Sequence, residues 1–249
     1  ALDGSALPSR ALVGGKAWSV ARMLSLGLRV PPAVVITTDA CRAYLDTGSV
    51  PQALASELDA AIAWLEQATG RQFGGAKPLL VSVRSGAAIS MPGMMDTVLN
   101  LGINDGTEAA LAAEAGDAGF ARDTHRRFLE LYANIVLKAT LPENAPHAPA
   151  ALRAEIESQG EAVPQDPRAQ LLAAVNAVFD SWNSRRARRY RQHHGIADSL
   201  GTAVTVQAMV FGNLDERSGT GVLFSRNPLT GDVAPYGEYL HRAQGEDVV

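Results

Sequence analysis

The spacing of the apolar residues changes along this chain, and that change limits the folds it can adopt. Apolar residues recur at helical spacing over 52–68 and 119–138, whereas the short β-branched run 33–37 is typical of a buried strand. The last fifty residues are instead typical of strands, over 202–211, 220–225 and about 236–243. We therefore predict an α+β fold of two lobes with a cleft between them.

Shorter signals predict the remaining elements and the boundaries between them. Helices are predicted over 16–26, from 38 or 39 to near 48, over 107–115 and as a pair after 168, and a strand over 79–84. The glycine-containing segment 85–104 is predicted as a loop, and five prolines between 139 and 168 predict a linker. We predict a first lobe over 1–106, a helical insertion over 107–200 and a β-rich second lobe over 201–249.

Composition and charge exclude several classes of protein. The chain has 249 residues, of which 47 % are hydrophobic, so disordered and fibrous proteins are excluded. The single cysteine, Cys41, can form no internal disulfide, and the longest apolar runs fall below the roughly 18 residues that a membrane helix needs. The net charge of −4 argues against a general nucleic-acid binder. We expect a cytoplasmic protein that binds neither nucleic acid nor a membrane.

One segment departs from this acidic balance. Five arginines lie between 185 and 191 on a predicted helix, and His193 and His194 follow them. Such a run is typical of a solvated or inter-domain helix face, and contact with RNA or polyphosphate is the alternative.

Standard catalytic motifs are missing, but three features favour a phosphate site. Lys16 follows two glycines yet lacks the rest of a Walker A loop, and neither a zinc spacing nor a GxSxG sequence is present. Lys16 is predicted at a helix start, where backbone N–H groups and a lysine can meet an anion. Arg84 ends a predicted strand, and the following loop 90–97 offers glycine and hydroxyl groups that can close over phosphates.

In their order along the chain these motifs resemble one family. Leu-Val-Gly-Gly-Lys at 12–16, Leu-Val-Ser-Val-Arg-Ser-Gly at 80–86, and the segments 90–101 and 201–211 resemble the N-terminal nucleotide-binding region of pyruvate phosphate dikinase. The segments 218–221, 225–228, 230–231, 237–240 and 243–249 do so as well. The Met-Pro-Gly-Met-Met-Asp sequence at 91–96 separates this family from phosphoenolpyruvate synthase and rifampicin phosphotransferase.

The resemblance implies an ATP-grasp fold that holds ATP and Mg²⁺ between two lobes. It implies the conversion of ATP, inorganic phosphate and pyruvate into AMP, diphosphate and phosphoenolpyruvate, with the β-phosphoryl group passing to a histidine on another domain. The partners implied are that phosphohistidine domain, a pyruvate-binding domain of the parent chain, and a second copy in a homodimer.

The resemblance also assigns roles to residues of this chain. Lys16 and Arg84 are expected to contact the ATP phosphates, and Arg84 and Arg127 to act in catalysis, with Arg127 binding inorganic phosphate. The other expected nucleotide contacts lie in a loop over the phosphates, a strand beside the adenine, and an acidic contact to the nucleoside. They are Gly93, Met94, Met95, Asp96 and Thr97; Gln207, Met209 and Val210; and Glu246.

Three departures from the family pattern leave alternatives open. The Asp-x-Glu pair and Gln-x-Arg element, which supply the metal ligands and a further arginine in the family, do not follow Glu246. No phosphohistidine segment is present, and the expected first strand before Gly14 is missing. We expect a piece of a longer protein, with no metal ligands of its own and with weak binding of Mg·ATP or none. The alternatives are a non-catalytic nucleotide-binding or interaction module and another kinase of the same superfamily.

Overall fold

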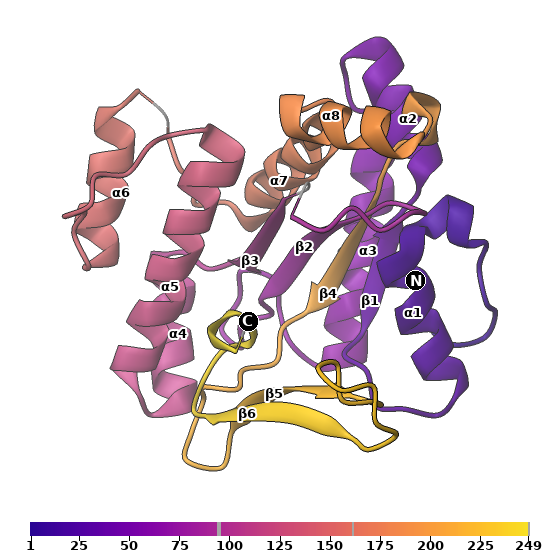
Figure 1. Ribbon diagram of the computed structural model, residues 1–249. Helices are drawn as coiled ribbons and strands as arrows, with labels where there is room; N and C mark the ends of the chain where they lie inside the picture. The colour runs from indigo at the N-terminus through magenta and orange to yellow at the C-terminus, as the bar shows by residue number, and fades with distance from the viewer. Residues whose placement is uncertain (94–95, 161, 249) are drawn as a thin grey trace. The chain divides into compact units, whose positions relative to one another are not determined.

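The structure, a computed structural model, describes residues 1–93, 96–160 and 162–248, apart from the side chain of Glu246 (Figure 1). The chain divides into two compact units, Ala1–Met209 (unit 1) and Val210–Val249 (unit 2). None of the helices that the structure describes is both long enough and apolar enough to cross a membrane.

Unit 1 combines helices with one antiparallel sheet of four strands in the order β1-β4-β2-β3. The strands are β1 (Ala33–Ile36), β2 (Val81–Gly86), β3 (Thr97–Leu101) and β4 (Ala203–Ala208). The α-helices are α1 (Arg10–Ser25), α2 (Thr38–Thr47), α3 (Gln52–Thr69), α4 (Asp105–Ala115), α5 (Ala118–Tyr132), α6 (Pro149–Ser158), α7 (Pro167–Ser181) and α8 (Arg185–His194). A π-helix, Ala133–Leu137, extends α5, and a 3-10 turn, Asp198–Leu200, precedes β4.

The sheet of unit 1 has one polar and one apolar face in its centre. Ser82 pairs with Gln207 and Arg84 with Thr205, so all four side chains share one face of β2 and β4. Valines occupy the alternate positions and face the other way. α1 packs on the polar face, and α3 and α7 lie across the apolar face (Figure 1). The apolar face contributes the core, and the polar face is left for α1 and a pocket.

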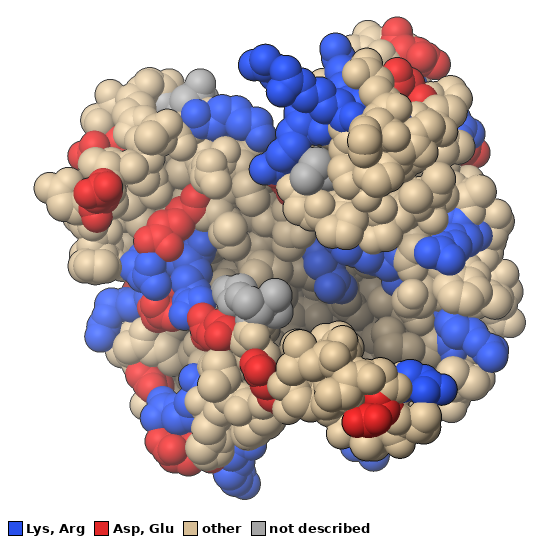
Figure 2. All heavy atoms as spheres, in the orientation of Figure 1, with Lys and Arg blue, Asp and Glu red and all other residues tan. Residues whose placement is uncertain are grey.

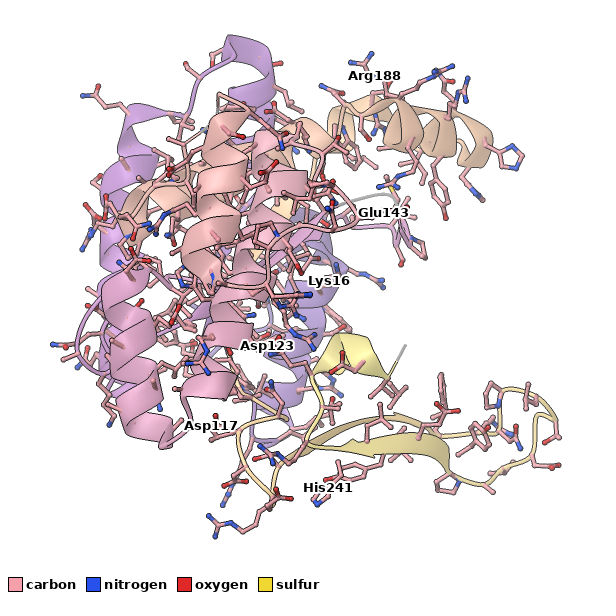
Figure 3. The ribbon with its side chains drawn as sticks, turned by 90° about the vertical axis from the view of Figure 1, so that its left-hand side faces the viewer. Lys16, Asp117, Asp123, Glu143, Arg188 and His241 are labelled. Atoms are coloured by element: carbon pink, nitrogen blue, oxygen red, sulfur yellow. The ribbon has the colours of Figure 1, made fainter. Side chains whose placement is uncertain are left out.

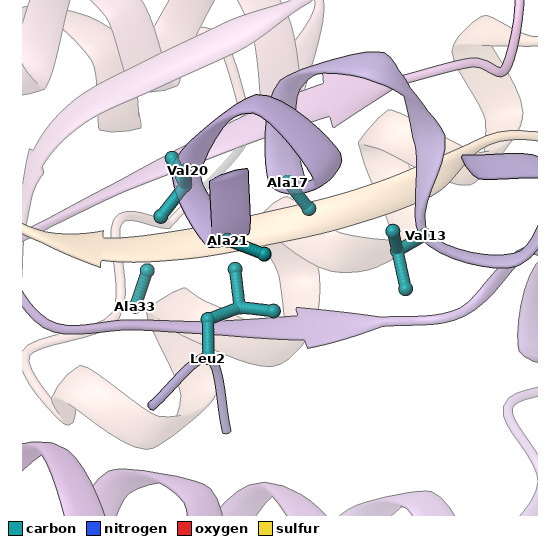
Figure 4. Close-up of a cluster of buried hydrophobic side chains, with 6 residues drawn as sticks. All are labelled: Leu2, Val13, Ala17, Val20, Ala21 and Ala33. Carbon is teal, nitrogen blue, oxygen red and sulfur yellow. The ribbon is translucent and has the colours of Figure 1, made fainter. Parts of the chain in front are cut away.

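Small side chains let α1 lie close to the sheet. A buried cluster joins α1 to β1 and to the start of the chain, and all its members are less than 9 % exposed (Figure 4). Its members are Leu2, Val13, Ala17, Val20, Ala21 and Ala33. The predicted spacing of apolar residues in 16–26 is therefore the face that packs, although the helix begins earlier, at Arg10.

Most predicted elements are confirmed, and three expectations were wrong or incomplete. β3 lies inside the segment 85–104 that was predicted as a loop, and α6 lies inside the predicted linker 139–168. Pro149 is the first residue of α6, a position where proline favours a helix, so the prolines there mark a helix start as well as loops. β4 pairs with β1 and β2 in unit 1, whereas the predicted second lobe began at 201.

Unit 2 is built on a two-stranded antiparallel sheet. β5 (Gly219–Phe224) pairs with β6 (Tyr236–His241), and a 3-10 turn, Gly245–Asp247, follows. Tyr239 lies across Gly219 and Gly221, where the ring occupies the place that a Cβ on Gly219 would take. Much of this sheet faces solvent, since Leu223 is 77 % exposed and Tyr239 is 63 % exposed.

Candidate functional site

A pocket of about 570 Å³ opens over the polar face of the unit 1 sheet. Its walls come from α1, from the ends of β2 and β4, and from the loop that joins β2 to β3 (residues 87–96). The residues that line it are Arg10, Gly15, Lys16, Ser19, Val20, Met23, Val30, Arg84, Ser85, Gly86, Ala87, Ile89, Ser90, Met91, Pro92, Gly93 and Gln207. Figure 2 shows basic side chains inside a hollow of the surface.

Two adjacent glycines bring Lys16 into this pocket. Gly14 has a φ of +76° and interrupts the helical backbone of α1, and a Cβ at this position would overlap the carbonyl group of Gly86. The backbone N–H of Gly15 donates to the carbonyl of Ala87 at 2.9 Å. This contact places Lys16 beside the end of β2, and it also engages one N–H group that we expected to be free for an anion.

Arg84 and Gln207 form the inner wall of the pocket. The Arg84 guanidinium donates to Oε1 of Gln207, and Nε2 of Gln207 donates to the carbonyl of Pro31 at 3.0 Å. The buried Nε of Arg84 and the buried hydroxyl of Thr205 have no hydrogen-bond partner among the described residues. A buried polar atom without a partner costs about 1–3 kcal/mol, so these two atoms lower the stability of the polar face of the sheet.

The pocket is strongly cationic. Its walls carry Arg10, Lys16 and Arg84, and no carboxylate stands among the lining residues that the structure describes. Desolvation by the pocket walls lowers the pKa of Lys16, and the neighbouring charge of Arg84 lowers it further. Burial alone lowers the pKa of Arg84. An anion stabilises desolvated positive charges that have no acidic partner, so the chemistry of the pocket favours a phosphate-bearing ligand.

The loop over the pocket is attached to the sheet at both ends. The backbone N–H of Ser85 donates to the carbonyl of Asp96 at 3.4 Å, and Thr97 begins β3, where it pairs with Arg84. Gly93 lines the pocket with a φ of +67°, and Asp96 forms an ion pair with Lys138 at 3.6 Å. Met94 and Met95, which were also predicted as contacts, lie outside the described residues.

The other predicted residues lie elsewhere in the chain. Arg127 is on α5, where its Nε donates to Asp123 at 2.9 Å, and it does not line the pocket. Met209 ends unit 1, where its N–H donates to the carbonyl of Leu80 at 2.9 Å. Val210 begins unit 2 with 72 % of its surface exposed, and Glu246 belongs to the 3-10 turn of that unit. The roles expected for these four residues stay predictions.

Arg10 lines the pocket although no sequence pattern predicted it as a site residue. Arg10 is separated from Lys16 by the break at Gly14, so helical spacing could not place the two side chains together. The only signal in the sequence was a basic residue shortly before a glycine pair. Gln207, in contrast, was expected at the site through its strand, and its side chain lines the pocket as well as contacting Arg84.

The arginines of α8 form a second basic group, away from the pocket. Arg191 is buried, stacks over the Trp182 ring at 4.1 Å and forms an ion pair with Asp198 at 2.6 Å. Arg185 and Arg188 are exposed, and basic side chains gather over α8 in the space-filling view (Figure 2). Lys16 and Arg188 lie well apart (Figure 3). One arginine of the run is thus structural, and the exposed ones agree with a solvated face.

A metal site is not evident in the described part of the chain. No three His, Cys, Asp or Glu side chains gather there in a way that can hold a metal ion. The pocket offers serine hydroxyls but no carboxylate among its described lining residues, and Mg²⁺ in nucleotide sites is usually held by carboxylates. The described residues therefore do not fit a protein-held Mg²⁺.

Comparison with known proteins gives one consistent family. The family model described as "Pyruvate phosphate dikinase, AMP/ATP-binding domain" matches residues 10–61 and 47–249. The chain is 48 % identical to pyruvate, phosphate dikinase of Rhizobium meliloti (strain 1021), over 99 % of this chain and 30 % of that protein. It is 47 % identical to the chloroplastic enzyme of Flaveria trinervia, over 96 % of this chain and 28 % of the relative. The chain thus spans less than a third of the length of these relatives.

Proposed function

The chain belongs to the family of pyruvate phosphate dikinase AMP/ATP-binding domains, and from this premise we propose that it is the ATP-binding part of such a dikinase. One observation carries the proposal. Lys16 and Arg84, which local sequence features and the family resemblance both assign to phosphate contacts, lie in one cationic pocket with Gly93 of the loop above it. Phosphoryl transfer depends mainly on positioning and on cations that stabilise negative charge, which is what this pocket offers.

In this proposal each wall of the pocket has its own part in binding. The ammonium of Lys16 and the guanidinium of Arg84 hold phosphate oxygens. The loop from Ala87 to Gly93 excludes water from the phosphates. Gln207 holds the Arg84 guanidinium in place from β4.

The finer features follow from the family and belong to the same proposal. We propose an ATP-grasp arrangement with the adenine beside Met209 and Val210 and the nucleoside near Glu246. The β-phosphoryl group passes to a histidine on another domain, with inorganic phosphate held by Arg127, and the parent chain makes phosphoenolpyruvate from pyruvate as a cytoplasmic homodimer. Because the described residues do not fit Mg²⁺, we derive no step through the metal.

Calorimetric titration of this chain with ATP tests the proposal. A hydrogen bond to a charged group contributes about 1.5–3 kcal/mol, so Lys16→Met and Arg84→Met should each weaken ATP binding about tenfold or more. Lys77→Met is the matched control, because Lys77 is an exposed lysine of unit 1 that does not line the pocket. Absence of ATP binding by the full-length parent protein, or equal affinities in all the variants, would contradict the proposal.

A further inference from the structure

Arg10 lies at the outer end of the pocket and has no counter-charge. It is the first residue of α1, is exposed and lines the pocket. Its guanidinium carbon lies 5.8 Å from the centre of the Trp18 ring, a cation–π distance. No ion pair joins Arg10 to a carboxylate among the described residues. An arginine steadied by an aromatic ring, without an acidic partner, is arranged to receive an anion.

The three cations of the pocket lie on different parts of its wall. Arg84 is bonded to Gln207 on β4, and the Cβ of Lys16 lies 3.7 Å from the position of a Cβ on Gly86. A guanidinium nitrogen of Arg10 lies 3.4 Å from the position of a Cβ on Gly15. Arg84 is partly buried and Arg10 is exposed, so the positive charge of the pocket extends from the sheet to the protein surface.

Positive charge on three side chains of one pocket matches a ligand with several negative charges. A nucleoside monophosphate has one phosphate, which the pair Lys16 and Arg84 is sufficient to hold. A triphosphate extends further and needs a cation at the outer end, where guanidinium groups bind phosphate oxygens in pairs. The pocket supplies one there in Arg10, beside the loop residue Ala87.

We infer that Arg10 is a specificity-determining residue, which contacts the outer phosphates of a nucleoside triphosphate and so lets the pocket distinguish ATP from AMP. This inference rests on the proposed function, since it assumes that the pocket binds a nucleotide. It adds a third phosphate contact to Lys16 and Arg84, and it assigns to that contact a task that the other two do not have.

The ratio of the ATP and AMP affinities tests this role. Arg10→Met should weaken ATP binding about tenfold, the loss of one charged hydrogen-bonding partner, and change AMP binding less than about twofold. Arg10→Lys keeps the positive charge but loses the paired hydrogen bonds of a guanidinium. Its ATP affinity should therefore lie between that of the unsubstituted chain and that of Arg10→Met. Arg22→Met is the matched control, because Arg22 is exposed on the same helix and does not line the pocket.

The outcomes separate this inference from the proposed function. If the full-length parent protein binds neither nucleotide in calorimetry, the proposed function fails and the inference fails with it. If the chain binds both and Arg10→Met weakens ATP and AMP equally, or weakens neither, only the inference is overturned. Thermal unfolding of each variant shows whether it is still folded. If Arg10→Met is unfolded, Arg10→Lys replaces it in the test. A fall in the ATP-to-AMP affinity ratio of Arg10→Lys would then support the inference, and an unchanged ratio would overturn it.

Discussion

The antiparallel sheet of unit 1 and that of unit 2 differ in what covers their strands. All six residues of β4 are buried, between β1 and β2 in the pairing and between α1 and the α3–α7 layer across the faces. Every residue of β5 and β6 is partly or fully exposed, including Leu223 and Tyr239. An isolated pair of strands is at best marginally stable, so the order of unit 2 rests on less buried surface per residue.

This contrast relates stability to function. Unit 1 has enough buried surface on the apolar face of its sheet to tolerate charged and partnerless polar groups on the other face. Arg84 and Thr205 are such groups, and both lie beside the pocket. Unit 2 has less buried apolar surface to offset such a cost, and its described residues include no buried cation.

Truncation of a buried side chain should give the largest difference between the two sheets. Leu101, in β3, is fully buried, so Leu101→Ala should lower the free energy of unfolding by about 3 kcal/mol. Leu223→Ala, in the exposed β5, should change it by less than about 0.5 kcal/mol. Urea denaturation followed by circular dichroism measures both, and equal losses would remove the contrast.

The second-largest difference in stability is expected between alanine substitutions at two glycines with positive φ, one in each unit. Gly14→Ala requires a left-handed backbone at a φ of +76° and drives a Cβ into Gly86, so the loss should exceed about 2 kcal/mol. Gly231, in unit 2, has a φ of +81° but nothing within 4 Å of its Cβ position, so Gly231→Ala should cost about 1 kcal/mol. Gly14→Ala should also weaken ATP binding by moving Lys16, and a variant with unchanged stability would contradict the close approach.

A substitution that is expected to stabilise unit 1 also tests the difference between the two sheets. Thr205 is fully buried with a partnerless hydroxyl, so Thr205→Val should raise the free energy of unfolding by about 1 kcal/mol. Thr220→Val in β5 should change it by less than about 0.5 kcal/mol, because Thr220 is only partly buried. If Thr205→Val is destabilising, the hydroxyl of Thr205 contributes to the stability of the fold and the polar face of unit 1 does not carry this cost.

The smallest expected effect is a pH dependence that arises from Lys16. Its pKa in the folded chain is lowered from 10.5 by desolvation and by Arg84, so the folded state releases this proton before the unfolded state does. Stability should therefore rise slightly as the pH increases through the lowered pKa toward 10.5. ATP binding should weaken over the same range, because the neutral amine no longer attracts phosphate.

Matched variants isolate this titration. Lys16→Met should abolish the contribution of Lys16 to the pH dependence of stability, whereas Lys77→Met should retain it. Unit 2 contains no lysine, so it adds no lysine titration of its own. Chemical denaturation at several alkaline pH values measures the slope. A slope that is the same in both variants would assign the titration to other groups.

Local patterns predicted most elements of unit 1, because helical periodicity and β-branched runs depend on neighbours in the sequence. The runs at 33–37 and 52–68 correspond to β1 and α3 nearly residue for residue. β3 was not predicted because the glycine and proline residues before it favoured a loop over 85–104. Its pairing with β2 is also a tertiary contact, which its own residues do not indicate. β4 was found as a strand, but its partners across the chain could not be read from its own residues.

The site was predictable only in part for the same reason. Lys16 and Arg84 were expected from local motifs, and the family resemblance brought in Gln207. What joins them is the contact of Gly14 with Gly86 and the pairing of β2 with β4, neither of which has a local signature. Arg10 was missed because its place depends on the backbone break at Gly14 and on the Trp18 ring.

A crystal structure of this chain with a non-hydrolysable ATP analogue tests the central claim most directly. We expect phosphate oxygens within hydrogen-bonding distance of Lys16 and Arg84, below the loop that follows β2. Phosphates bound instead to the exposed arginines of α8, or a pocket without nucleotide at saturating concentration, would contradict it.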